Sequence, residues 1–266
     1  MTDVLPESRD RLPGPDDRKS ESPLYAFLGA LLVASAGMAV AFAFTAGAGI
    51  LVATSGVPVS RRLSFVLTLL TGGVGFVTAA VAYQRYRGMN PRSYVGLSVP
   101  SLGDLTWAVG GYLGAMALVT LSGIVLTAFQ VNPDTANRAA EAGMQTPSLL
   151  LWLVPLSFLV VAPAEEFLFR GTVQRRLREA MPAWAAIPLT AVVFATFHFF
   201  SLTGGAGGRF VAIGVLFLPS LVFGAVYEYT GNVVASMLVH GAYNSTLVLL
   251  LYVSLSMGTP PVPGVL

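Results

Sequence analysis

The chain has 266 residues, of which 55% are hydrophobic and 11% are charged, and its mean hydropathy is +0.72. Soluble domains carry about 25% charged residues, so this composition excludes an ordinary soluble protein and indicates a membrane protein. The absence of cysteine excludes disulfides and thiolate metal sites, and the net charge of +2 gives no sign of a nucleic-acid partner, so we expect none.

The first segment, residues 1–23, is polar, mixed in charge and rich in proline, and we expect a disordered, solvated tail. It does not resemble a signal peptide, because its charge is mixed and the apolar run that follows is too long. Residues 24–257 are predicted to form a single transmembrane domain, and residues 258–266 a short C-terminal tail.

Long apolar runs occupy most of the domain. A hydrocarbon core of about 30 Å requires about 20 helical residues. Seven runs approach or exceed that length: 24–48, 63–83, 105–129, 147–169, 184–200, 210–229 and 232–257. They lack the alternation of a membrane β-barrel. The sequence therefore predicts an all-α, polytopic transmembrane helical bundle of about seven spans, with eight as the alternative.

The basic residues predict the orientation, because cytoplasmic loops are enriched in lysine and arginine. One side of a seven-span arrangement has four of them: Arg61, Arg62, Arg138 and Arg209. The other side has eleven: Arg9, Arg11, Arg18, Lys19, Arg85, Arg87, Arg92, Arg170, Arg175, Arg176 and Arg178. We therefore expect an integral protein of the cell membrane with a cytoplasmic N-terminus. The basic segment 171–182 is predicted to be a short interfacial helix or loop.

Several polar groups fall inside or at the ends of the apolar runs, where an ionisable residue costs several kcal/mol and is a functional candidate. They are Glu165, Glu166, Arg170, His198, Glu228, His240 and Asn244. Both histidines of the chain are among them. Glu228 ends its run and is interpreted as a residue of the membrane interface.

Spacing sorts these groups. Glu166 and Arg170 are four residues apart and can pair on one helix face, as a structural pair at the membrane interface or as part of a site. Glu165 lies about 100° further around the helix and can point into the bundle. His240 and Asn244 are also four apart. The alternative interpretation is a buried histidine and an interhelical amide hydrogen bond.

The set could hydrolyse an amide bond. A carboxylate and a histidine can activate one water, and a second histidine and an amide can stabilise an oxyanion. Alternatively, Glu165, His198 and His240 could bind zinc and leave one position for water. The residues alone leave both mechanisms open. No H-E-x-x-H, G-x-S-x-G, Walker A or Rossmann pattern is present in a suitable context.

Three motifs occur in order on successive apolar runs: EEFLFR (165–170), FATFH (194–198) and HGAYN (240–244). Together they resemble the motif set of the CPBP intramembrane proteases, which include type II CAAX prenyl endopeptidases and bacterial Abi-type membrane proteins. The resemblance covers about residues 147–250, and the first three spans contain no matching motif.

The resemblance implies a helical bundle with a conical cavity that opens to the membrane and the cytoplasm. It implies that water is activated by Glu165 and His198, and that the oxyanion site is completed by His240 and Asn244. The other two motif residues, Glu166 and Arg170, would support the site. Substrates would be membrane-associated or lipidated proteins or peptides, and prenylation is an analogy only.

The metal-free mechanism is the one we expect, with no required cofactor and zinc as the alternative. There is no third histidine, and zinc-bound histidines need an acceptor for their second ring nitrogen. The neighbouring side chains Thr196 and Tyr243 offer few such acceptors. Other functions left open are a non-catalytic membrane scaffold, a bacteriocin-immunity protein and, last, a proton-coupled transporter.

Overall fold

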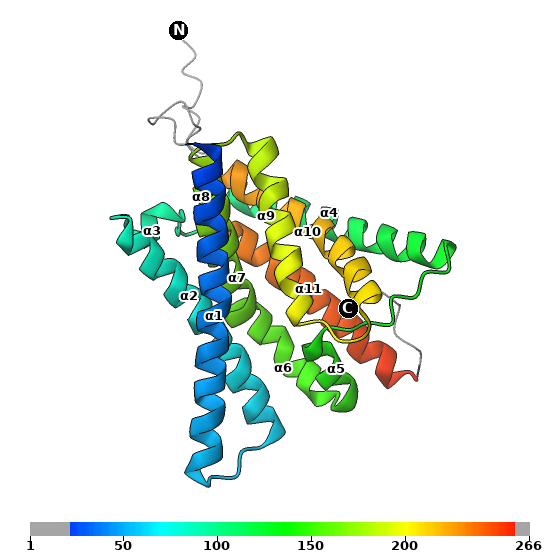
Figure 1. Cartoon of the computed structure of the whole chain (residues 1–266). Coiled ribbons are helices and arrows are strands. Elements are labelled where there is room, and N and C mark those ends of the chain that lie inside the picture. Colours follow the sequence, from blue (N-terminus) through cyan, green and yellow to red (C-terminus); the bar gives the residue numbers. More distant parts are fainter. Residues whose placement is uncertain (1–21, 259–266) are drawn as a thin grey trace.

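The structure is a computed structural model, and it describes residues 22–258. These residues form helices and no β-strand. The long helices are α1 (Pro23–Ser55), α2 (Arg61–Tyr86), α4 (Leu102–Ala128), α9 (Ala183–Phe197), α10 (Ala206–Thr230) and α11 (Val233–Ser256) (Figure 1). The short helices outside the fourth span are α3 (Pro91–Tyr94), α5 (Arg138–Gln145) and the 3₁₀ turn η4 (His198–Phe200).

Seven helical segments of the described residues are long and apolar enough to cross a membrane. Six are α1, α2, α4, α9 with η4, α10 and α11, and the remaining one is the composite segment Ser148–Arg178. The predicted helical bundle of seven spans is therefore confirmed, and residues 22–258 contain no eighth. Most of the two predicted tails lies outside the described residues.

The fourth span contains two wide turns. It consists of α6 (Ser148–Leu156), the π-helical turn η2 (Ser157–Val161), α7 (Ala162–Leu168), the π-helical turn η3 (Phe169–Gln174) and α8 (Arg175–Arg178). Pro155 and Pro163 flank η2, and neither can donate an i→i−4 hydrogen bond. We attribute the widening of the helix at η2 to this pair of prolines, because such turns relieve the clash of the proline ring with the preceding turn.

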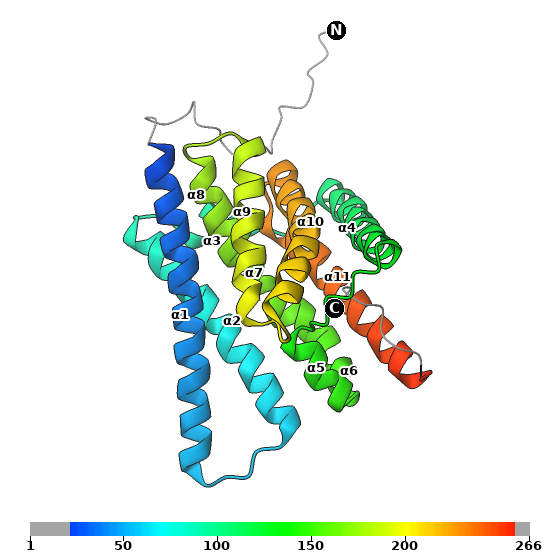
Figure 2. The same ribbon diagram turned by 45° about the vertical axis from the view of Figure 1, so that its right-hand side comes forward.

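Helices α1 and α2 form a hairpin that extends past the other helices at the end away from Pro23 (Figures 1 and 2). They cross closely at Gly75, where a Cβ would lie 2.4 Å from the Ala41 Cα, so only glycine fits there. The outer surface of the bundle exposes large apolar side chains such as Leu32 and Leu51, as expected where a helix faces lipid.

Two parts of the chain differ from the sequence-based expectation. The segment after Arg170 is neither a loop nor a surface helix, because it continues the fourth span as η3 and α8 with Val173 and Leu177 fully buried. Its apolar residues follow the helical period inside a basic sequence, and they pack against α1 and α9. Helix α5 was not predicted, since its eight residues are too short and polar to read as a span.

Candidate active site

The acids of the first motif lie on α7, between the two π-helical turns. Glu166 is fully buried, and its Oε1 accepts a hydrogen bond of 2.9 Å from Arg170. Arg170 also donates to the Ser220 backbone carbonyl (3.0 Å) and hydroxyl (2.7 Å) on α10. The predicted pairing of Glu166 with Arg170 is thus present. Both side chains are fully buried.

Aromatic rings explain how the bundle accommodates a buried guanidinium. The Arg170 Cζ lies 4.6 Å from the ring centre of Phe194 and 5.3 Å from that of Phe223. Cation–π attraction of this kind is strongest when the cation is desolvated. Together with the Glu166 carboxylate, the two rings replace part of the hydration that Arg170 loses.

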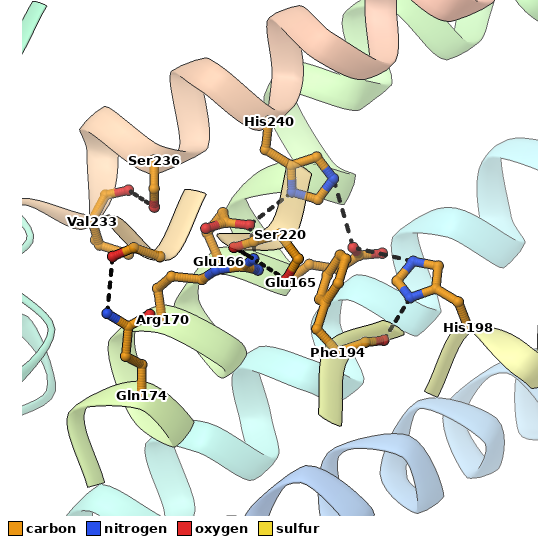
Figure 3. A network of polar contacts seen from close by, with 11 residues as sticks. Glu165, Glu166, Arg170, Gln174, Phe194, His198, Ser220, Val233, Ser236 and His240 are labelled. Atoms are coloured by element: carbon orange, nitrogen blue, oxygen red, sulfur yellow. Dashed lines mark hydrogen bonds and ion pairs between the residues drawn. The ribbon is translucent and has the colours of Figure 1, made fainter. Parts of the chain in front are cut away.

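His240 on α11 is held by the same acid. Its Nδ1 lies 2.8 Å from Glu166 Oε1, and its ring stacks on Phe223 at a centroid distance of 4.8 Å and an interplanar angle of 19°. Because a carboxylate can only accept, Nδ1 carries the proton of this hydrogen bond. The Nε2 atom points away from Glu166 and toward Glu165 (Figure 3).

His198 is the first residue of η4, directly after α9. Its Nδ1 donates to the Phe194 backbone carbonyl, 2.8 Å away, since a carbonyl accepts. The chain turns from an α-helix into a 3₁₀-helix at this residue. Its Nε2, like that of His240, is left without a backbone partner and points toward Glu165 (Figure 3).

Glu165 lies between the two imidazoles. Its Oε2 is 3.8 Å from His198 Nε2 and 3.8 Å from His240 Nε2, and the same buried oxygen makes no hydrogen bond to any described protein group. These separations exceed a direct hydrogen bond. A water oxygen between Glu165 Oε2 and either Nε2 atom could bond to both, so the geometry is suited to holding a water beside Glu165.

One cavity of about 960 Å³ connects these residues. Glu165, His198, His240 and Asn244 all line it, so the four residues predicted to be catalytic converge on one space. Most of the other lining side chains are apolar. The cavity is therefore suited to a hydrophobic substrate segment rather than to a small polar metabolite.

The donors of a metal site are only partly in place. No group of three His, Cys, Asp or Glu side chains within residues 22–258 is arranged to hold a metal ion. The argument that the histidines lack acceptors is nevertheless wrong. His240 Nδ1 bonds to Glu166 and His198 Nδ1 bonds to the Phe194 carbonyl, which is the arrangement of metal-binding histidines. The side chains of Glu165, His198 and His240 are thus of types that bind zinc. Their donor atoms, however, are not arranged around a single metal position.

Some polar residues of the region were missed by the sequence analysis. Buried side-chain hydrogen bonds link Gln84 Nε2 to the Thr172 hydroxyl (2.7 Å) and Gln174 Nε2 to the Gly224 carbonyl (3.0 Å). These contacts could not be predicted from the sequence, because the two glutamines are uncharged and nothing in the sequence indicates which helix they would face. The ion pair of 2.8 Å between Glu228, which is 8% exposed, and Arg178 was not predicted either.

Comparison with known families gives one match. Residues 147–246 match the family described as Rce1-like, type II CAAX prenyl endopeptidase Rce1-like. The match confirms the resemblance to the CPBP intramembrane proteases and supports, at the level of the family, a CAAX-type intramembrane protease. No curated protein and no solved structure matches the chain.

Proposed function

We propose that this protein is an intramembrane endopeptidase that hydrolyses peptide bonds of membrane-associated proteins with water activated by Glu165 and His198. The observation that supports it most is the position of Glu165 Oε2, buried, unpaired and 3.8 Å from the Nε2 atoms of both histidines. A structural carboxylate is expected to have hydrogen-bond partners, as Glu166 Oε1 has in Arg170 and His240, whereas a catalytic base must keep an oxygen free for water.

In the proposed first step, Glu165 accepts a proton from the water while His198 Nε2 accepts its other hydrogen in a hydrogen bond. The hydroxyl oxygen attacks the scissile carbonyl carbon, and the carbonyl π electrons move to oxygen. The resulting oxyanion accepts hydrogen bonds from the Asn244 amide and from protonated His240 Nε2. Glu165 then returns its proton to the amide nitrogen, the C–N bond breaks, and a carboxylic acid and an amine leave.

The surrounding groups fit this sequence of steps. Glu166 accepts the Nδ1–H of His240, which stabilises the charged imidazolium that donates to the oxyanion. Should zinc be bound, Glu165, His198 and His240 would hold it and it would lower the pKa of its water. In the metal-free mechanism, Glu165 must take the proton from water. Asn244 must donate a hydrogen bond to the oxyanion.

The test is a peptidase assay of the purified protein with a panel of membrane peptides, including prenylated and unprenylated versions of one peptide. We expect Glu165→Gln to abolish hydrolysis without changing the melting temperature, because an amide does not accept the water's proton. Glu141→Gln, the same change on α5 outside the cavity lining, is the matched control and should keep full activity. Turnover by Glu165→Gln at the parental rate would reject the assignment and favour a non-catalytic role.

A further inference from the structure

One buried hydroxyl in the wall of the cavity has no partner in the described protein. Tyr243 on α11 lines the cavity and is 4% exposed, so its phenol is removed from bulk solvent. Within residues 22–258 this hydroxyl forms no hydrogen bond. Because buried tyrosine hydroxyls usually have a hydrogen-bond partner, the partner of Tyr243 is expected to come from the cavity.

The other hydroxyls of the cavity lining are used by the protein or lie at its exposed edge. Four of them form hydrogen bonds to protein groups, and they belong to Thr45, Thr68, Ser157 and Ser201. The fifth belongs to Ser64, which is exposed near the start of α2. Tyr243 is therefore the one buried hydroxyl of this lining that the described residues leave without a partner.

Tyr243 lies close to the proposed reacting groups. It is three residues after His240 and directly before Asn244, and all three residues line the cavity. Three residues advance an α-helix by about 4.5 Å, and one residue of an extended peptide spans about 3.3 Å. A substrate segment that reaches His240 along α11 therefore passes Tyr243 within one or two residues of the scissile bond.

The position of the Tyr243 ring is fixed by the aromatic cluster that orients His240. The ring packs against Phe223 at a centroid distance of 5.7 Å and an interplanar angle of 71°. Phe223 in turn stacks on His240. A ring held in this way presents its hydroxyl at a defined place in the wall, at little cost in conformational entropy.

A peptide substrate in this cavity needs a donor of this kind. The carbonyls of a helix are engaged in its own hydrogen bonds, so a segment must unwind before one of its peptide bonds can be attacked. The unwound carbonyls then lie among lining side chains that are mostly apolar, where an unsatisfied carbonyl is costly. A phenol hydroxyl can donate one hydrogen bond to such a carbonyl.

We propose that the Tyr243 hydroxyl donates a hydrogen bond to a backbone carbonyl of the substrate next to the scissile bond. The proposal rests on the proposed function and adds a substrate-binding residue to it. Tyr243 holds the unwound segment in register with Glu165, whereas the oxyanion is bound by Asn244 and His240. Loss of the hydroxyl therefore weakens substrate binding and leaves the chemical step largely unchanged.

The first test is Tyr243→Phe, which removes only the oxygen and keeps the ring against Phe223. In detergent, KM for a membrane peptide should rise by about 3- to 10-fold, the effect of losing one hydrogen bond between uncharged groups, with kcat close to parental. The same rise should appear in the Kd of the peptide when Tyr243→Phe is added to Glu165→Gln, which binds without hydrolysing. The melting temperature without peptide should not fall, because no hydrogen bond within the described protein is lost.

Tyr112→Phe is the matched control, because Tyr112 lies outside the cavity lining and its hydroxyl is 2.9 Å from the Thr246 hydroxyl. This change should lower the melting temperature and leave KM and Kd at their parental values. Parental KM and Kd in Tyr243→Phe would overturn the proposal. A fall in melting temperature as large as that of Tyr112→Phe would overturn it too, since it would reveal a structural partner.

Thioamide peptides identify the carbonyl that is bound. In each peptide one carbonyl oxygen near the scissile bond is replaced by sulfur, a weaker acceptor. One replacement should weaken binding to Glu165→Gln, and this loss should disappear when Tyr243→Phe is added. Equal losses with and without Tyr243→Phe at every position would contradict the proposal. Failure of the proposed function is distinguishable, because the parent would then hydrolyse no peptide, whereas failure of this proposal leaves parental hydrolysis intact.

Discussion

The imidazole of His240 and the carboxylate of Glu166 are in direct contact, with Nδ1 and Oε1 2.8 Å apart inside the bundle. The second acid of the motif therefore does more than neutralise Arg170. It fixes the orientation of one of the two histidines, and through that ring it connects the buried ion pair to the cavity. Glu165 and Glu166, adjacent in sequence, thus face different partners.

Glu166→Gln should lower kcat by about 10- to 100-fold, the usual effect of losing the group that orients a functional histidine. The change removes the carboxylate that holds His240 through Nδ1. KM should change little, because Glu166 does not line the cavity. Steady-state kinetics with one membrane peptide measure both constants. The orienting role would be refuted by a folded Glu166→Gln protein with parental kcat, and Glu166→Asp should recover part of the activity.

Arg170→Ala should destabilise the protein by about 3–5 kcal/mol, because it leaves Glu166 as a buried charge without its strongest partner. Arg170→Lys keeps the charge but cannot contact Glu166 and Ser220 with one planar group, so an intermediate loss is expected. Thermal unfolding in detergent measures the series. A protein with Arg170→Ala that is as stable as the parent and yet inactive would instead make Arg170 a catalytic residue.

Exhaustive chelation should leave peptidase activity intact, and elemental analysis should find no stoichiometric zinc. The expectation rests on the donors, since no three described His, Cys, Asp or Glu side chains are arranged to hold a metal. A soluble zinc peptidase treated with the same chelator serves as the control. About one zinc per chain, with activity lost on chelation and restored by zinc, would reverse the mechanism and make Glu165, His198 and His240 ligands.

Stability should depend on pH through Glu179, which directly follows the fourth span. Burial raises its pKa, but hydrogen bonds from Arg87 (2.8 Å and 3.1 Å) and from the Tyr94 hydroxyl (2.8 Å) hold that pKa below its ordinary value. A pKa lowered by folding stabilises the protein above the unfolded-state value, and this stabilisation is lost as pH falls through the folded-state value.

The measurement is the melting temperature from neutral to acidic pH for the parent and Glu179→Gln. The difference between the two proteins should be largest near neutral pH and shrink toward acid, where Glu179 is protonated. Glu141→Gln, which changes a carboxylate of α5, should follow the parent. A constant difference between parent and Glu179→Gln across this range would contradict the assignment.

The number of spans was predictable because length and hydropathy are set by the bilayer, and these properties belong to local segments of the chain. The four cavity residues were also predictable, since Glu165, His198, His240 and Asn244 are costly in apolar helices and follow a recognisable order. Their roles stay predictions, because spacing and position do not establish chemistry.

The contacts between distant helices could not be predicted. Ser220 and Phe223 look like ordinary residues of an apolar span, yet one accepts from Arg170 and the other stacks on His240. Such pairings depend on how α10 is rotated against the fourth span, which the helical period within one segment does not determine. The burial of Arg170 was missed for the same reason, because a basic residue at the end of an apolar run usually indicates the interface.

The wide turn η2 has a consequence for changes in chain length. A π-helical turn contains one residue more than the α-helix would place there, so deleting one residue from Ser157–Val161 should restore the regular ladder and rotate the preceding part of the span relative to α7 by about 100°. Either Glu165 or the α6 residues that line the cavity, Leu149 and Leu153, would then no longer face it. Single insertions or deletions should inactivate the protein here, whereas the same changes in the connection 56–60 should be tolerated.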